Sequence, residues 1–345
     1  MCGIAGFSGP GDRRDLGAMT RSIGHRGPDG VGYYINPEIG LHLGHRRLAI
    51  IDIEDGYQPL WNEDKTVCVI FNGEIYNHAE LRSALESKGH RFSTDHSDTE
   101  VLVHGWEEWG VDMPSHLNGM FAFSIWDANT KKIFLARDRF GEKPLYWGLQ
   151  NGLFLFASEL SAFKVHRGFN TSIDHMALKK FFAYGYIPSP NAFYQDAHKL
   201  PAGHWLLFDQ TSSDIKTHCY WQYRIEENPN PPSIQDAAEE IRYLLLQSIK
   251  RRLMSDVPIG VFLSGGIDSS AVAAGACRYL APSNVNSFTI GFKDASFDES
   301  QFAQYVSETL GCNHQLKTLD GRLTDTAYSD ILNRMDEPLG DSSLF

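Results

Sequence analysis

The sequence predicts two domains of different class, an α+β sandwich of antiparallel sheets followed by part of a parallel-sheet α/β domain. The chain has 345 residues, which is enough for two domains that each bury a core. Up to about residue 210, short apolar or alternating runs separated by turn residues are typical of antiparallel strands. Beyond a proline-rich segment, strands and helices alternate, which is typical of a parallel sheet. We therefore expect a first domain at 2–210, a linker at 211–232 and a second domain at 233–345.

The elements of the first domain follow from the period of its apolar residues. Seven segments have the pattern of strands: 3–7, 31–35, 66–71, 120–126, 132–136, 153–157 and 204–208. Helical periodicity occurs at 78–88, 99–109 and 174–184. Three helices are too few for a βαβ order, so we expect sheets flanked by helices.

The second domain begins after a segment with three prolines, Pro229, Pro231 and Pro232, which is typical of a linker. The pattern then gives a helix at 233–254, a strand at 257–263, a helix at 268–280, a strand at 285–292 and a helix at 299–310. Only about 113 residues follow the linker, and the last ten contain no closing element. We therefore expect the chain to be cut within its second domain.

Composition excludes several classes of partner. The chain carries 31 basic and 43 acidic residues, a net charge of −12, and has no run of five or six basic residues, so we expect no nucleic acid and no anionic membrane surface. No apolar run approaches the roughly 20 residues of a membrane span, and no secretory signal is present, so we expect a cytoplasmic protein. The acidic balance leaves small-molecule or protein partners. Five scattered cysteines lack zinc-site spacing, which favours reduced thiols.

Cys2 is a candidate nucleophile. Removal of Met1 leaves a thiol and an α-amino group on one residue, and an amine that titrates near 7.7–8.0 is able to take the thiol proton. The alternative is that Cys2 is merely a small residue at the start of a strand.

Other polar residues of the first domain have two interpretations each. Asn72-Gly73 after an apolar run is a hairpin signal, but an Asn amide and a Gly N–H also suit an oxyanion hole, and Glu74 suits a substrate ammonium. Arg47 is either a solvated strand charge or a clamp for an α-carboxylate. Asp98 is either a helix N-cap or a second ammonium ligand.

Together these residues match class II glutamine amidotransferases in order and spacing. The match comprises Cys2, 25–29, Arg47, 72–74, Asp98 and 137–146. The resemblance implies an N-terminal-nucleophile fold, a four-layer αββα sandwich, which hydrolyses glutamine through a thioester on Cys2. It implies that Asn72 and Gly73 form the oxyanion hole, that Arg47 binds the glutamine carboxylate, and that Glu74 and Asp98 bind its amino group.

A second motif, Ser264-Gly265-Gly266-Ile267-Asp268-Ser269, joins a predicted strand to a predicted helix, where N–H groups and hydroxyls suit an anion. It lacks the lysine of ordinary NTPase loops, and a plain flexible turn is the alternative. The motif resembles the pyrophosphate loop (PP-loop) of ATP pyrophosphatases, which belong to the adenine nucleotide α-hydrolase-like fold. That resemblance implies Mg²⁺ binding by Asp268 through the pyrophosphate, and ATP contacts by Leu263, Ser264, Gly265, Gly266, Asp268, Ser269 and Ile290. Ile290 is equally explained as a core residue.

The two motifs in one chain resemble glutamine-hydrolysing asparagine synthetases over essentially the whole sequence. The resemblance implies a ligase with glutamine, aspartate and Mg-ATP as substrates, which adenylates the aspartate side chain and forms asparagine, AMP and pyrophosphate. Homodimers are common in that family. Its second acidic Gly-rich signature is absent here, and we expect its place to lie beyond Phe345. The alternatives are another carboxylate acceptor, a fragment with glutaminase activity alone, a stand-alone amidase, and a non-catalytic regulator.

Overall fold

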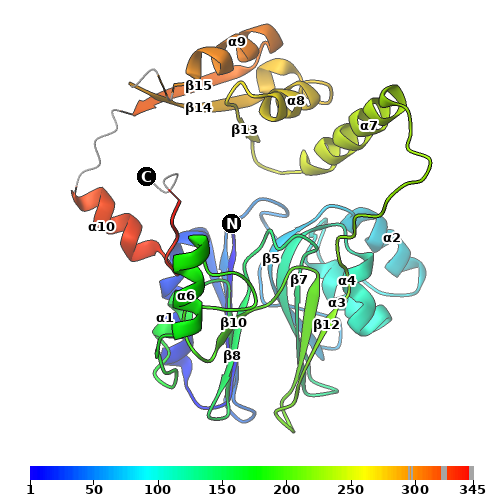
Figure 1. Ribbon diagram of the computed structural model, residues 1–345. Coiled ribbons are helices and arrows are strands. Elements are labelled where there is room, and N and C mark those ends of the chain that lie inside the picture. Colours follow the sequence, from blue (N-terminus) through cyan, green and yellow to red (C-terminus); the bar gives the residue numbers. More distant parts are fainter. Residues whose placement is uncertain (294–295, 297, 320–324, 342–345) are drawn as a thin grey trace. The chain divides into compact units, whose positions relative to one another are not determined.

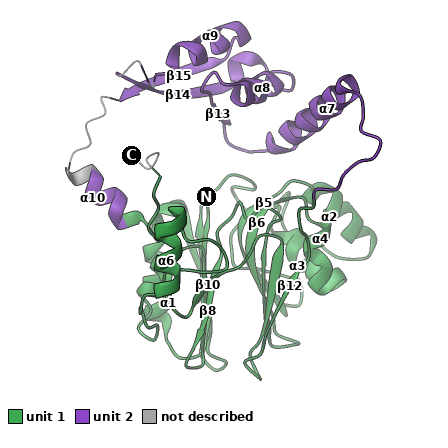
Figure 2. Cartoon of the chain, viewed as in Figure 1, with its two compact units in different colours: residues 1–224, 334–344 green, residues 225–333, 345 purple. Residues whose placement is uncertain are grey.

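The structure, a computed structural model, describes residues 1–293, 296, 298–319 and 325–341 (Figure 1). The chain forms two compact units (Figure 2). The first contains residues 1–224 and the described residues from 334 onward, and the second contains the described residues of 225–333. Among the described residues, no helix is both long and apolar enough to cross a membrane.

The first unit contains two six-stranded sheets whose strands pair antiparallel. The order in one sheet is β10 (Ala197–Lys199), β8 (Tyr146–Gln150), β9 (Leu153–Ala157), β1 (Gly3–Ser8), β3 (Leu41–Arg47) and β2 (Gly30–Asn36). The order in the other is β12 (Ile215–Cys219), β11 (His204–Asp209), β7 (Lys132–Arg137), β6 (Gly119–Asp127), β5 (Val67–Ile75) and β4 (Leu60–Trp61). The helices are α1 (Arg13–Ser22), α2 (His78–Ser87), α3 (Glu100–Trp109), α4 (Met113–His116), α5 (Ser161–Lys164) and α6 (His175–Tyr184), with 3₁₀ turns at Gly24–Arg26 and Gly110–Asp112.

Three apolar cores stack these elements into four layers. The central core joins side chains of both sheets, among them Ile4 of β1 and Ile70 of β5. A second core lies between the first sheet and α1, which contributes Leu16 and Met19. A third lies between the second sheet and the helices α2 and α3. This helix–sheet–sheet–helix order confirms the αββα sandwich (Figure 1).

The seven predicted strands and three predicted helices of the first unit are present, with small shifts at their ends. The expected end at residue 210 differs from the structure, because β12 pairs with β11 within the predicted linker and the unit continues to Arg224. The segment from Arg334 also belongs to the first unit. We therefore propose that the first domain extends past 210 and that the linker is shorter than expected.

The second unit contains a parallel sheet in the order β13 (Gly260–Phe262), β14 (Asn286–Phe292) and β15 (Asn313–Leu319), as predicted for its class. Its helices are α7 (Ile234–Arg252), α8 (Ile267–Ala276), α9 (Ser300–Leu310) and α10 (Asp325–Arg334), with a 3₁₀ turn at Pro282–Asn284. The strands are not buried on both faces, since Ile290 is 47% exposed and Phe262 is 84% exposed. Helices α8 and α9 pack against each other and against the strands of this sheet.

Candidate active site

One pocket of the first unit is lined by all six residues predicted for glutamine chemistry: Cys2, Arg47, Asn72, Gly73, Glu74 and Asp98. They come from separate elements, because Cys2 precedes β1, Arg47 ends β3, and Asp98 lies just before α3. Asn72, Gly73 and Glu74 belong to the second half of β5. The sandwich therefore brings residues that are 96 positions apart in the sequence to one pocket.

Cys2 is held by its backbone and by its sulfur. Its Sγ accepts a hydrogen bond from the Leu48 N–H at 3.4 Å. Its carbonyl accepts one from Arg26 Nε at 2.9 Å, and Arg26 in turn pairs with Glu159 at 2.7 Å. Burial raises the pKa of the Cys2 thiol, so a base has to take the proton before the sulfur is a strong nucleophile.

Asn72 and Gly73 lie within β5 and not in a turn, opposite Ala122 and Phe121 of β6. The hairpin interpretation of this pair is therefore wrong. Asn72 is 1% exposed, and its Nδ2 has no hydrogen-bond partner among the described residues. A buried amide donor without a partner costs free energy, so its presence at a pocket indicates a ligand acceptor.

The Gly73 N–H also faces the pocket. Phe121 lies opposite Gly73. Its N–H donates to the Asp138 carboxylate, and its carbonyl accepts the Asp138 N–H. The Gly73–Phe121 pair is therefore not hydrogen-bonded, and the Gly73 N–H points away from β6. On that same edge of β5, the Phe71 N–H donates to Gln58 and the Ile75 N–H donates to Asp98. A Cβ at Gly73 would lie 2.2 Å from the Met120 carbonyl oxygen, so only glycine fits there.

The charged residues of the pocket are fixed by backbone contacts. Two N–H donors of Arg47 bond to the carbonyls of Asp52 and Ile53, and its guanidinium lies 4.8 Å from the centre of the Tyr57 ring. A guanidinium has five such donors, so others are available for a ligand carboxylate. Asp98 accepts the Ile75 N–H at 3.0 Å, and burial, with a contribution from Glu74, raises the pKa of Asp98 to about 7.

Sequence reasoning missed two further residues of this pocket, Gln58 and Thr99. Gln58 accepts the Phe71 N–H at 2.6 Å through Oε1 and donates from Nε2 to the Thr99 hydroxyl at 3.3 Å, so it joins β5 to the start of α3. A glutamine in a turn carries no pattern that marks it in the sequence.

The loop between β13 and α8 in the second unit has the form expected of an anion site. The Ser264 hydroxyl accepts the Gly266 N–H at 3.3 Å and lies 3.1 Å from the Ser269 hydroxyl. Gly266 caps α8, which begins at Ile267 and carries Asp268 in its exposed first turn. Gly265 has φ +82°, a left-handed conformation that favours glycine.

A second pocket lies beside this loop. Its lining includes Leu263, Ser264 and Ile290, three of the residues predicted to contact ATP. The other four, Gly265, Gly266, Asp268 and Ser269, lie on the loop and in the first turn of α8. Because Ile290 is 47% exposed, its interpretation as a buried core residue is wrong.

Comparison with known proteins assigns both units to families. A family model described as glutamine amidotransferase domain matches residues 1–221, and one described as asparagine synthase matches residues 240–345. The putative asparagine synthetase [glutamine-hydrolyzing] 2 of Methanocaldococcus jannaschii is 36% identical over 375 residues, which cover all of this chain and 70% of that protein. The chain belongs to the glutamine-hydrolysing asparagine synthetase family.

Other members of the asparagine synthetase family are longer than this chain. The asparagine synthetase [glutamine-hydrolyzing] 1 of Bacillus subtilis is 36% identical over 348 residues, which cover 99% of this chain and 54% of that protein. The chain thus spans about half the length of that relative. A solved structure titled as the allosteric regulatory enzyme of purine biosynthesis matches 92% of this chain and 80% of its own, with a TM-score of 0.50 and 18% identity. That match concerns the fold alone.

Proposed function

We propose that this chain is the glutamine-hydrolysing and nucleotide-binding part of an enzyme that makes asparagine. Glutamine is hydrolysed in the first unit, and the ammonia amidates an aspartate side chain that the second unit activates with ATP. The convergence of six predicted residues in one pocket, with an unpartnered Asn72 amide among them, is the observation that carries this proposal. Family membership and the nucleotide-type loop support the second half.

The glutaminase step uses Cys2 as nucleophile. After removal of Met1, the α-amine of Cys2 accepts the thiol proton, and Sγ attacks the carboxamide carbon of glutamine. Asn72 Nδ2 and the Gly73 N–H bind the oxyanion. The C–N bond then breaks, the leaving nitrogen takes a proton and departs as ammonia, and water hydrolyses the thioester to glutamate and the free thiol.

Charged groups orient the substrate for this attack. Arg47 binds the α-carboxylate of glutamine, because its remaining N–H donors suit a planar anion. Glu74 and Asp98 bind the α-ammonium group. A pKa near 7 for Asp98 belongs to the pocket without a cation, and a bound ammonium favours the ionised form.

The second unit binds ATP and aspartate. The loop hydroxyls and N–H groups bind the phosphates, and Ile290 contacts the adenine ring. Asp268 is a carboxylate at the exposed start of α8, which fits Mg²⁺, since that ion is usually held by one or two carboxylates together with substrate phosphates. When bound there, Mg²⁺ neutralises charge on the pyrophosphate. We also place the enzyme in the cytoplasm. We expect a homodimer, which sedimentation velocity tests.

Glutamate release from glutamine tests the first half of the proposal. The variant Cys2→Ala is expected to release no glutamate above background, while Cys219→Ser, which changes an exposed thiol, keeps the wild-type rate. Mass spectrometry of the purified chain is expected to show Cys2 as its first residue. Glutaminase activity in Cys2→Ala would overturn the assignment.

Pyrophosphate formation from ATP and aspartate tests the second half of the proposal. The variant Asp268→Asn is expected to lose this activity. Pyrophosphate release that depends on another carboxylic acid would identify a different acceptor. Glutamate release without any pyrophosphate, whatever acid is added, would leave a glutaminase alone.

A further inference from the structure

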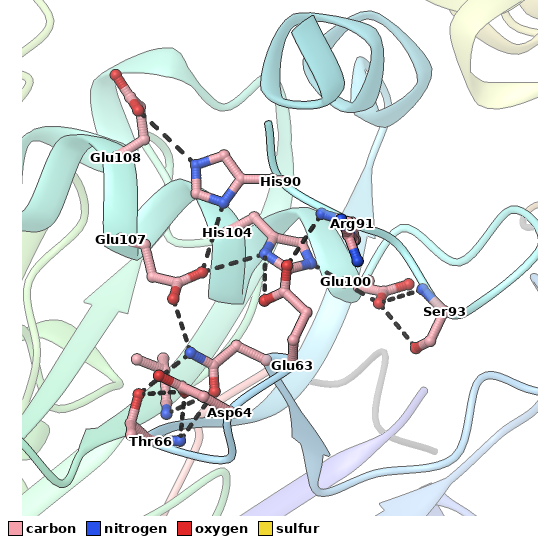
Figure 3. A network of polar contacts seen from close by, with 12 residues as sticks. Glu63, Asp64, Thr66, His90, Arg91, Ser93, Glu100, His104, Glu107 and Glu108 are labelled. Atoms are coloured by element: carbon pink, nitrogen blue, oxygen red, sulfur yellow. Dashed lines mark hydrogen bonds and ion pairs between the residues drawn. The ribbon is translucent and has the colours of Figure 1, made fainter. Parts of the chain in front are cut away.

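A group of histidines and carboxylates lies in the outer helical layer of the first unit, apart from the glutamine pocket (Figure 3). His104 and Glu107 are one turn apart on α3. His90 follows α2, and Glu63 lies in the turn between β4 and β5. Neither the proposed glutaminase nor the proposed synthetase chemistry uses any of these four residues, which we call the α3 cluster.

Three donor atoms, one each from His90, His104 and Glu107, lie within 4.8 Å of one another, and Glu63 Oε2 lies beside His104 Nδ1. His104 Nδ1 lies 3.1 Å from Glu107 Oε2 and 3.7 Å from Glu63 Oε2, and His90 Nδ1 lies 3.6 Å from Glu107 Oε2. Two of these separations exceed hydrogen-bond length. A tetrahedral zinc ion with bonds of about 2.0–2.2 Å places its ligand atoms roughly 3.3–3.6 Å apart. His104 and Glu107 thus share a direct hydrogen bond, while the other two separations, 3.6 and 3.7 Å, are close to the ligand–ligand distances around a tetrahedral ion.

The second oxygen of each carboxylate is occupied by the protein. Glu107 Oε1 accepts a hydrogen bond from Asn62 Nδ2 at 2.7 Å, and Glu63 Oε1 accepts the Arg91 N–H at 3.0 Å. These contacts fix both side chains and turn the remaining oxygens toward the histidine nitrogens. Two imidazoles and two carboxylates make a donor set that suits zinc.

The ring of His104 is also oriented from behind. Its side chain is fully buried, and its Nε2 faces Glu100 Oε1 at 3.7 Å without a hydrogen-bond partner among the described residues. Glu100 is itself fixed by the N–H and hydroxyl groups of Ser93 and Thr94. A carboxylate behind a histidine, on the side opposite the metal, is the usual outer contact of a zinc ligand.

We propose that His90, His104, Glu107 and Glu63 bind one divalent transition-metal ion, with zinc the best fit. Four protein donors leave no open position for a substrate, so the site is structural. The ion joins α3 to the two loops beside it. The competing occupant is a proton on His104, held between the same carboxylates.

Zinc titration of the metal-free full chain by isothermal calorimetry tests the proposal. One ion per chain is expected at the α3 cluster. His90→Gln and Glu63→Gln change partly exposed side chains and are expected to weaken binding at least about tenfold, and Glu100→Gln about 10–100-fold, as outer contacts do. His175→Gln alters an exposed histidine outside the cluster and is expected to bind like wild type.

Thiols are the alternative zinc ligands, because Cys277 Sγ and Cys312 Sγ lie 3.6 Å apart and Cys2 is reactive. Cobalt(II) separates these cases, since thiolate ligands give an intense near-ultraviolet charge-transfer band and a nitrogen–oxygen site does not. We expect visible d–d bands of tetrahedral cobalt without that band, unchanged in Cys277→Ser. Absence of metal binding, or equal zinc affinity in wild type, His90→Gln and Glu63→Gln, would overturn the proposal and leave a protonated His104 as the occupant.

Discussion

The side-chain Nδ2 of Asn72 is buried without a partner among the described residues. Its removal should therefore affect activity much more than stability. We expect Asn72→Ala to lower kcat for glutamine hydrolysis about 10²–10³-fold, the usual effect of removing one oxyanion donor. The melting temperature should fall little, because no hydrogen bond from Nδ2 is lost on substitution. Steady-state kinetics and calorimetry on the same preparation measure both quantities. A large loss of stability with kcat retained would contradict the oxyanion role.

Asp98 predicts a pH dependence of substrate binding. Burial raises the pKa of this carboxyl to about 7, so it becomes protonated as the pH falls below that value. The KM for glutamine should therefore rise below about pH 7. In Asp98→Asn, KM should be about 10–100-fold higher at pH 8, as expected for a lost hydrogen bond to a charged group, and should lose this pH dependence. A wild-type KM that is constant from pH 5.5 to 8 would contradict the assignment.

The same shift has a consequence for stability. Because the pKa of Asp98 is raised from 3.8, the folded protein binds more protons than the unfolded chain between about pH 4 and 7, and its stability falls as the pH rises through that window. Asp98→Asn should thus raise the free energy of unfolding at pH 8 by about 1–2 kcal/mol while it impairs binding. Denaturant titrations at pH 5 and pH 8 measure this, and we expect the gain only at pH 8.

The residues of the glutamine pocket were predictable because each has a distinct chemical type at a distinct position. Cys2 behind an initiator methionine is such a case. Gln58 and the members of the α3 cluster were not predictable, since their contacts join segments that the sequence separates. Arg91 and Glu63, for example, are in contact only because the turn between β4 and β5 lies beside the loop before α3.

Among the elements, β5 shows where local signals fail. Asn72-Gly73 is a hairpin signal, yet it lies inside a nine-residue strand, whereas the same dipeptide at Asn151-Gly152 does form the turn between β8 and β9. The pairing with β6 and the contact of Ile75 with Asp98 outweigh the local turn preference. Helix α1 was missed although Asp12 and Asp15 form a capping box at its start, because Gly17 and three arginines weaken its apolar pattern.

In the loop before α8, we expect that the addition of one methyl group at Gly265 disturbs the packing of α9. Gly265 has φ +82°, and a Cβ there would lie 2.5 Å from Phe302 Cβ of α9. Gly265→Ala should therefore displace α9 from the loop and raise hydrogen exchange in α8 and α9. Gly311→Ala is the matched control, because Gly311 also has positive φ (+77°) but its Cβ would meet only Pro282 at 3.6 Å. The positive φ alone should lower the stability of Gly311→Ala by about 1–2 kcal/mol. Equal exchange in both variants would show that contact with Phe302 is unimportant.

At the scale of the whole molecule, the sequence predicts the two fold classes but not the course of the chain. The segment after α10 follows the parallel sheet in sequence, yet it packs on the first unit. Asp336 accepts the Leu160 and Ser161 N–H groups at 2.6 and 2.7 Å, and Glu337 accepts the Phe193 N–H at 2.9 Å. A carboxylate that accepts hydrogen bonds from backbone N–H groups 144–176 residues away in the sequence leaves no local sequence pattern.

These long-range contacts predict how the segment is released. Glu337→Ala removes the acceptor of the Phe193 N–H and the partner of Lys199, which are hydrogen bonds to a charged group and together stabilise the attachment by about 1.5–3 kcal/mol. Hydrogen exchange at Gly340, whose N–H donates to the Gly185 carbonyl at 2.7 Å, should therefore be roughly 10–100-fold faster in this variant. Glu226→Ala changes an exposed carboxylate of the linker and should leave that rate unchanged. Equal exchange in the two variants would mean that Glu337 does not hold the segment on the first unit.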